Sequence, residues 1–413
     1  MWVRRIRVVA LILALAPVDV ADAQEFTYRG FTEVRSMVYA LTAPRDDSRL
    51  AVEGRVRFEP AYRPVRWLTL EASVGARIDN LSQVERTWHL DWRDRGTRRP
   101  ALAVRQATAA LRKGRFVAGV GKQFIRWGKA DILTPTDRFA PRDFLEVTND
   151  ELLAVTGTRF QYEAGSHAFD VVWVPFFTPS RTPLFDRRWA VVPENLGAFE
   201  VVDQGSMFPD RSQAGARWSY TGSGLELSVS YFDGLNHLPE ITAQPLSGLP
   251  VIVVTRSYVP LRMAGIDSAL PLRWFTIKGE AALLDTASAT ADDLVLYVIQ
   301  LERMQGELSL VGGYAGEMVT RRRSIFSFAP DRGLARSFLG RASYTIDVNR
   351  SVTVEAAVRQ NLDGVSVKGE YSQATGVRWR ITLAGTAIGG RSGDFFGQYR
   401  RNSHLTLSAR YSF

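Results

Sequence analysis

Apolar and polar residues alternate along most of this chain, in stretches of about ten residues. Residues 68–77 and 352–359 show the pattern most clearly, because every second position holds Leu, Val or Ala and the positions between include Thr, Glu and Arg. Successive side chains of a β-strand point to opposite faces of the sheet, so this period gives each strand one apolar and one polar face. The pattern predicts an all-β protein.

The connections between these stretches alternate in length. Tight turns are predicted at residues such as Lys113-Gly114, Gly165-Ser166 and Asn349-Arg350. Longer connections are predicted at residues 42–48, 80–99, 126–152, 177–211, 235–257, 287–291, 320–334, 361–364 and 387–402. Short turns at one end of the strands and longer loops at the other are typical of a transmembrane antiparallel β-barrel. The spacing therefore predicts one β-barrel domain at residues 24–413, with about 18 strands and 16 as the alternative.

Both ends of the sequence agree with an exported barrel. Residues 1–23 have the pattern of a signal peptide, with three arginines before a short apolar run and Ala21-Asp22-Ala23 as the cleavage site. The alternating residues 404–413 end with Tyr411 and Phe413 on the apolar face. This ending resembles the closing strand of bacterial outer-membrane barrels, which the barrel-assembly machinery recognises. The resemblance predicts an outer-membrane location, with membrane lipid and lipopolysaccharide as surroundings, and Tyr411 and Phe413 as the assembly signal.

Other classes of protein find little support in the sequence. The chain has no Cys, and its four His residues are scattered without the H-E-x-x-H or H-x-x-x-H spacing of a metal site. No G-x-S-x-G nucleophile elbow occurs. The net charge of +9 is not accompanied by a recognisable nucleic-acid-binding module. We therefore expect no enzyme, no cofactor, no metal and no nucleic-acid partner.

The polar faces of the strands carry more cations than anions. Five of these cations are predicted to face the centre of the lumen: Arg55, Arg57, Arg77, Arg105 and Arg159. Rings of Arg or Lys favour anions in a pore. Alternatively, such residues form cross-strand ion pairs with carboxylates and only hold the barrel in shape. The sequence leaves both interpretations open.

One predicted loop differs from the rest in its density of charged and aromatic residues. Its sequence from residue 121 is GKQFIRWGKADILTPTDRFAPRDF, and its charged residues are Arg126, Lys129, Asp131, Asp137, Arg138, Arg142 and Asp143. We expect residues 126–145 to fold into the lumen as a constriction, anchored by Trp127, Ile132, Phe139 and Phe144. Thr136-Asp137 is expected to cap a short helix, and Gly119 and Gly121 to make room for the loop. The alternative is an ion-paired extracellular loop that never contacts a solute.

The same segment carries a resemblance to known proteins. Residues 121–131 and 136–143 resemble an uncharacterised proteobacterial outer-membrane β-barrel family with the signature G-[RK]-Q-x-x-x-W-G-x-A-D followed by T-D-x-x-N-P-[RK]-D. More distantly they are similar to the alginate-export type of porin. Gln106, Ile132 and Ala140 depart from the pattern of the family. The resemblance implies an outer-membrane barrel that passes hydrophobic or other organic compounds, in some cases beside an export complex.

Together these observations predict a porin-like outer-membrane channel. Small organic solutes, among them anions, would pass through a lumen that the loop at 126–145 narrows. The alternative is a non-diffusive barrel, which would transport hydrophobic compounds or act as the outer-membrane partner of an envelope export complex.

Overall fold

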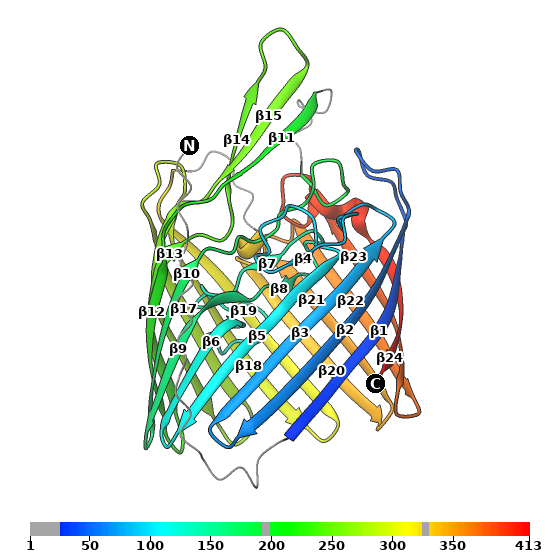
Figure 1. The fold of residues 1–413 in the computed structure, drawn as a ribbon. Helices are drawn as coiled ribbons and strands as arrows, with labels where there is room; N and C mark the ends of the chain where they lie inside the picture. Colours follow the sequence, from blue (N-terminus) through cyan, green and yellow to red (C-terminus); the bar gives the residue numbers. More distant parts are fainter. Residues whose placement is uncertain (1–24, 192–198, 324–329) are drawn as a thin grey trace.

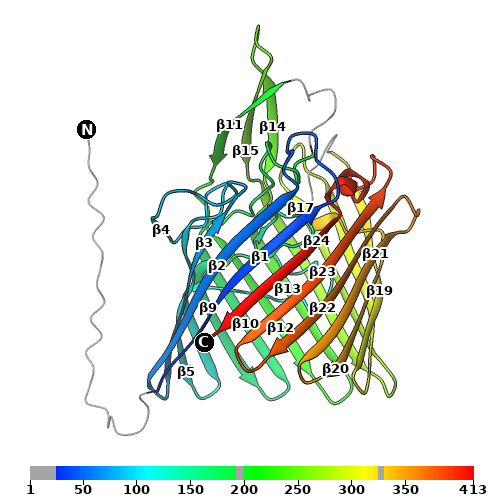
Figure 2. The same cartoon turned by 90° about the vertical axis from the view of Figure 1, so that its right-hand side faces the viewer.

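The computed structural model describes residues 25–191, 199–323 and 330–413. The predicted signal peptide at 1–23 lies outside these ranges. The described residues form a closed antiparallel β-barrel of 18 strands, seen from two sides in Figures 1 and 2. The predicted fold class and the larger of the two predicted strand numbers are therefore confirmed.

Each barrel strand pairs with the next one along the wall, and the last pairs with the first. The barrel strands are β1 (Glu25–Tyr39), β2 (Leu50–Val65), β3 (Leu68–Asp79), β5 (Leu102–Lys113), β6 (Phe116–Gln123), β9 (Val155–Ala164), β10 (His167–Phe176), β12 (Gln213–Thr221), β13 (Glu226–Leu235), β16 (Pro260–Pro271), β17 (Thr276–Thr286), β18 (Asp293–Gln305), β19 (Leu308–Arg321), β20 (Ser337–Asp347), β21 (Arg350–Arg359), β22 (Gly364–Thr375), β23 (Trp379–Gly390) and β24 (His404–Ser412).

The predicted alternation of short and long connections is present in the structure. Tight turns join the strands at the end where the chain enters β1, and the long loops gather at the opposite end (Figure 1). The longest of them connect β6 to β9 and β10 to β12. One predicted turn is misplaced, because Arg63-Pro64 lies within β2 and the chain turns at residues 66–67.

The remaining elements belong to the long loops. β4 (Leu90–Asp91) runs parallel to the first two residues of β5, while β7 (Arg142–Asp143) and β8 (Glu151–Leu152) pair with each other inside one loop. β11 (Glu200–Met207), β14 (Glu240–Pro245) and β15 (Val251–Ser257) form a small sheet that projects above the barrel (Figure 1). The apolar run at 251–255, within the predicted long connection 235–257, forms part of strand β15. The described parts of the loops also hold two 3-10 helices, η2 (Pro330–Arg332) and η3 (Gly397–Asn402).

The two faces of the wall have the chemistry that the alternation predicts. On β24 the side chains of Leu405 and Leu407 are 62% and 53% exposed and point outward, where hydrocarbon would cover them. On the same strand Arg410 points inward and donates to Glu33 of β1. Within the described ranges, no helix is long and apolar enough to span a membrane.

The seam of the barrel closes between the first strand and the last residue. The backbone of Phe413 exchanges two hydrogen bonds with Gly30 of β1, at 2.9 and 3.0 Å. A Cβ atom at Gly30 would lie 2.6 Å from the Phe413 ring and 2.6 Å from the carbonyl oxygen of Arg57. The absence of a side chain at Gly30 therefore allows the aromatic ring to pack across the seam.

The seam yields a first prediction. We expect Gly30→Val to destabilise the folded barrel by ~1–3 kcal/mol, the usual cost of overpacking a tight contact. The free energy of unfolding in urea, followed by the heat-modifiable shift on gels, measures it. Gly312→Val in β19 is the matched control, because its Cβ atom would meet no atom within 4 Å. Equal stability of the two variants would contradict the prediction.

Candidate functional site

The loop between β6 and β9, residues 124–154, folds into the lumen instead of outward. Trp127 is 4% exposed and Phe139 is 1% exposed, and they pack against each other edge to face, with ring centres 5.1 Å apart. Both belong to an apolar cluster with inward-facing residues of β10, β13, β16, β17 and β18, among them Phe232 and Met263. Burial of two large rings against the inner wall holds this half of the loop inside the barrel. The predicted inward position of the loop is confirmed.

The space for these rings comes from glycines other than the predicted ones. A Cβ atom at Gly215 of β12 would lie 2.8 Å from Trp127 and 2.9 Å from Phe139, and one at Gly265 of β16 would lie 2.7 Å from Thr136. The expectation that Gly119 and Gly121 make room for the loop is wrong. Gly121 has φ +120° and lies against the backbone of a neighbouring strand, while the side chain of Gln123 occupies the space beside Gly119.

Two carboxylates fix the backbone of this half of the loop. Glu280 of β17 accepts hydrogen bonds from the backbone N–H groups of Lys129, Ala130 and Thr136, at 2.7 to 3.2 Å. Asp137 accepts from the N–H groups of Trp127 and Gly128. The predicted helix at Thr136-Asp137 is therefore absent, because Asp137 bonds backwards along the chain and does not cap a following helical turn. The bent backbone leaves these N–H groups without backbone partners, and carboxylates of the wall and of the loop accept their hydrogen bonds instead.

The other half of the loop is tied by ion pairs to two neighbouring loops and to the opposite arc of the wall. Asp143 accepts from Arg99 at 3.0 Å and from Arg181 at 3.2 Å, and all three side chains are almost fully buried. Glu146 binds Arg35 of β1 at 2.8 Å. Glu151 receives three arginines of the inner wall, which are Arg55, Arg77 and Arg105. The loop thus runs across the lumen from an apolar attachment to an ionic one.

The buried acids of this attachment are ionised. Burial alone would raise the pKa of Asp143, but the positive charges of Arg99 and Arg181 outweigh it and lower that pKa. In the same way Arg35 and Arg99 lower the pKa of Glu146 against the effect of burial. Arg77 and Arg105 hold the pKa of Glu151 well below its usual range. Each acid therefore carries its charge at neutral pH.

The structure brings most of the predicted lumen residues into contact with the loop. Of the predicted arginines, Arg55, Arg77 and Arg105 meet at Glu151. Arg159 pairs with Asp170, which also accepts the indole N–H of Trp127 at 3.1 Å. Arg57 differs, because it forms no ion pair with a described residue and instead lies 5.1 Å from the centre of the Phe31 ring.

The charged residues of the loop pair mostly with other elements. Within the segment 126–145, Arg126 pairs with Asp137 at 3.3 Å. The other pairs connect the loop to its surroundings or bridge its two ends: Lys129 with Glu226, Asp131 with Lys278, Arg138 with Asp331 and Arg142 with Asp150.

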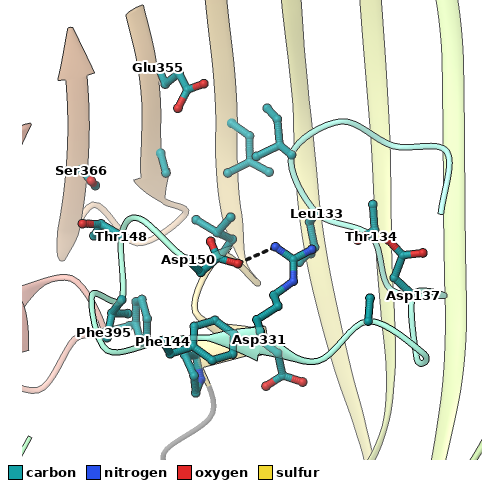
Figure 3. Close-up of a pocket in the computed structure, with 18 of the residues that line it drawn as sticks. Leu133, Thr134, Asp137, Phe144, Thr148, Asp150, Asp331, Glu355, Ser366 and Phe395 are labelled. Carbon is teal, nitrogen blue, oxygen red and sulfur yellow. Dashed lines mark hydrogen bonds and ion pairs between the residues drawn. The ribbon is translucent and has the colours of Figure 1, made fainter. Parts of the chain in front are cut away.

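A cavity of about 400 Å³ remains between the loop and the arc of wall formed by β20 to β23. Its wall side includes Arg341, Glu355, Ser366 and Lys368, and η2 and the β23–β24 loop border it. Figure 3 shows Asp150 near the middle of the view, with Glu355 and Ser366 on the strands at the left and Leu133 on the loop to the right of Asp150.

Several residues of the site escaped sequence reasoning. Glu146 and Glu151 follow the charged segment directly, yet only their arginine partners show their role. Arg181 comes from the β10–β12 loop, which also sends Trp189 to a buried position beside Tyr399. No spacing in the sequence links these loops, because their contacts depend on the closed shape of the barrel.

Comparisons with known proteins support the fold. No model of a known protein family matches the sequence, and no curated protein is similar to it. Among solved structures, OccAB4 of Acinetobacter baumannii superposes with a TM-score of 0.56 over 95% of this chain and 99% of its own, at 10% identity. OpdQ of Pseudomonas aeruginosa gives a TM-score of 0.52 over 95% and 98%, also at 10% identity. Both are outer-membrane porins, and this chain has their fold. The resemblance of residues 121–143 to a sequence signature stays a prediction.

The ionic attachment of the loop predicts a dependence on pH. Because the pKa values of Asp143, Glu146 and Glu151 are lower in the folded protein than in the unfolded chain, their ion pairs are complete at neutral pH and are lost between about pH 5 and pH 1. We expect amide exchange at residues 143–152 to stay slow from pH 8 to about pH 5, after correction for intrinsic rates, and to accelerate below that.

The variant Glu151→Gln tests the origin of this effect. It leaves three arginines without their shared carboxylate, so exchange at 143–152 should already be fast at neutral pH. Residues of β21, which the loop does not tie, serve as the internal reference. Slow exchange in the variant at pH 7 would contradict the proposed role of Glu151.

Proposed function

We propose that this protein is a channel of the bacterial outer membrane through which small organic solutes diffuse. The observation that carries the proposal is the cavity between the inward loop and the β20–β23 arc. An 18-stranded barrel is too wide to be filled by its own side chains, and the loop occupies only part of its interior. The loop then acts as a constriction that sets the size of the solutes, and no catalytic step is required.

An excess of cations on one arc of the wall supports a preference for anions. The inner faces of β2, β3 and β5 carry Arg55, Arg57, Arg77 and Arg105, and Arg410 of β24 lies beside them over the Phe31 ring. The carboxylates Glu33, Glu53 and Glu151 neutralise part of this charge. Arg57 has no such partner among the described residues, so its charge is the one most available to a passing anion.

Planar bilayers provide the test of the channel. We expect the purified, folded protein to show steady conductance, and a variant lacking residues 128–143 to show a severalfold larger one, because the deletion removes the constriction. Trp127→Ala with Phe139→Ala is a second variant that loosens the loop without shortening it. A folded barrel with no conductance would overturn the proposal and favour a non-diffusive barrel. Unchanged conductance in both variants would place the constriction elsewhere.

Selectivity is a separate prediction. We expect reversal potentials in a salt gradient to favour anions in the wild type, and Arg57→Glu to reduce or reverse this preference because it replaces the unpaired cation by an anion. Arg273→Glu, in the exposed turn between β16 and β17, is the control with the same change of charge. An equal shift in both variants would show that only the net charge of the protein matters.

We also infer that Tyr411 and Phe413 serve as the signal for barrel assembly. Both lie at the end of the closing strand, where Phe413 bonds to Gly30 and Tyr411 packs against Trp379 with ring centres 5.2 Å apart. Their place at the seam supports this role, because the last strand must be recognised before it can pair with the first.

A further inference from the structure

Some ion pairs at the cavity beside the loop have two accessible partners. Arg341 and Glu355 both line it and lie 2.6 Å apart on neighbouring strands, with side chains 36% and 40% exposed. Lys368 lines it too and pairs with Glu370, outside the lining, at 3.4 Å, with 38% and 37% exposed. On the opposite side, Arg142 of the loop pairs with Asp150, in the middle of the view in Figure 3. Each side of the cavity therefore presents both signs of charge.

These pairs differ from the ion pairs that tie the loop to the β1–β5 arc. The pairs of Asp143 and Glu146 are mostly buried, with side chains 3–13% exposed, so separating their partners would leave a charge in a poorly solvated place. Arg341–Glu355 and Lys368–Glu370 are much more exposed, and exposed pairs contribute little net free energy. A solute can therefore replace one partner of an exposed pair at small cost.

The charge of a solute decides how well it can replace the partners of an exposed ion pair. A solute with one charge replaces one partner and leaves the other partner of that pair without a counterion. A zwitterion carries a carboxylate for Arg341 or Arg142 and an ammonium group for Glu355 or Asp150. It can thus satisfy both partners, which neither an anion nor a cation of the same size can do.

The same cavity has an apolar part. Ile132 and Leu133 of the loop, Leu334 after η2 and Phe395 before η3 are half-buried and border it. They come from three different loops and pack together on the buried cluster around Trp189. An apolar portion of a solute would cover their exposed surface and gain from the removal of that surface from water.

We propose that this cavity selects small zwitterions that carry an apolar group, as aromatic and branched aliphatic amino acids do. The inference rests on the proposed channel function and names its substrate class. Glu355 and Arg341 are the residues that determine specificity, with Asp150 and Arg142 opposite them. The arginine-rich arc acts separately, and it ranks anions above cations among solutes with a single charge.

Three solutes with the same phenyl group test the selection by charge. L-Phenylalanine is the zwitterion, 3-phenylpropionate lacks its ammonium group, and 2-phenylethylammonium lacks its carboxylate. Uptake into proteoliposomes, corrected for protein-free liposomes, should be at least about threefold faster for phenylalanine than for either relative, the factor expected from one further exposed pair. Leucine should likewise enter faster than asparagine, a zwitterion of nearly the same shape without an apolar side chain.

Two variants assign the effect to the cavity. Glu355→Gln leaves Arg341 without its partner, so 3-phenylpropionate should gain on phenylalanine and the rate ratio should fall towards one. Arg341→Gln should bring the same gain to 2-phenylethylammonium. Asp347→Asn is the matched control, because Asp347 pairs with Arg350 in the turn at the other end of the same hairpin, at 39% and 48% exposure, and it should leave the ratios unchanged.

The possible failures are distinguishable. Faster entry of 3-phenylpropionate than of phenylalanine in the wild type would overturn the inference and leave the channel intact. Equal ratios in Glu355→Gln and Asp347→Asn would also overturn it, because the cavity would then play no part in selection. Absence of both uptake and bilayer conductance would overturn the proposed function itself.

Discussion

The closure of the sheet by backbone hydrogen bonds between β1 and β24 is the constraint on which the rest of the structure depends. Hydrocarbon offers no partners to backbone N–H and C=O groups, so a sheet in a bilayer must have no free edge. Closure with 18 strands gives the backbone groups of every strand hydrogen-bond partners on both sides. It also creates an interior that side chains alone cannot fill. The loop at 124–154 occupies part of this interior, and it can lie there because a barrel of 18 strands is wide enough to admit it.

The interior separates two uses of charge. Around Asp143 and Glu146, arginines and carboxylates are buried together and hold the loop, and removal of one partner would leave an uncompensated charge. In the β20–β23 cavity the pairs remain exposed and are free to exchange partners with a solute. Residues of the same chemical types thus serve attachment in one place and recognition in the other, and their burial decides which.

The fold could be predicted from the sequence, because the alternation of apolar and polar residues and the lengths of the loops are visible in neighbouring residues and reflect the bilayer. The sequence also placed the segment 126–145 in the lumen and identified Trp127 and Phe139 among its anchors. It could not assign the partners of Asp131 or Asp143, since Lys278 and Arg181 lie far away in the chain and meet them only in the closed barrel. For the same reason Gly215 and Gly265 were missed, because a glycine in a strand gives no sign of which loop will lie against it.

The attachment of one loop to two opposite arcs of the wall has a mechanical consequence. Phe139 is fixed among β13 and β16, and Glu151 among β2, β3 and β5, so the segment between them braces the cross-section of the barrel. A barrel without such a brace can flatten under lateral pressure, since its strands are joined only along the wall. Here a change in the cross-section would have to stretch or release the brace. The width of the cavity is therefore coupled to the cross-section of the whole barrel. Lateral pressure from the surrounding membrane, which acts on that cross-section, then also influences the width of the cavity.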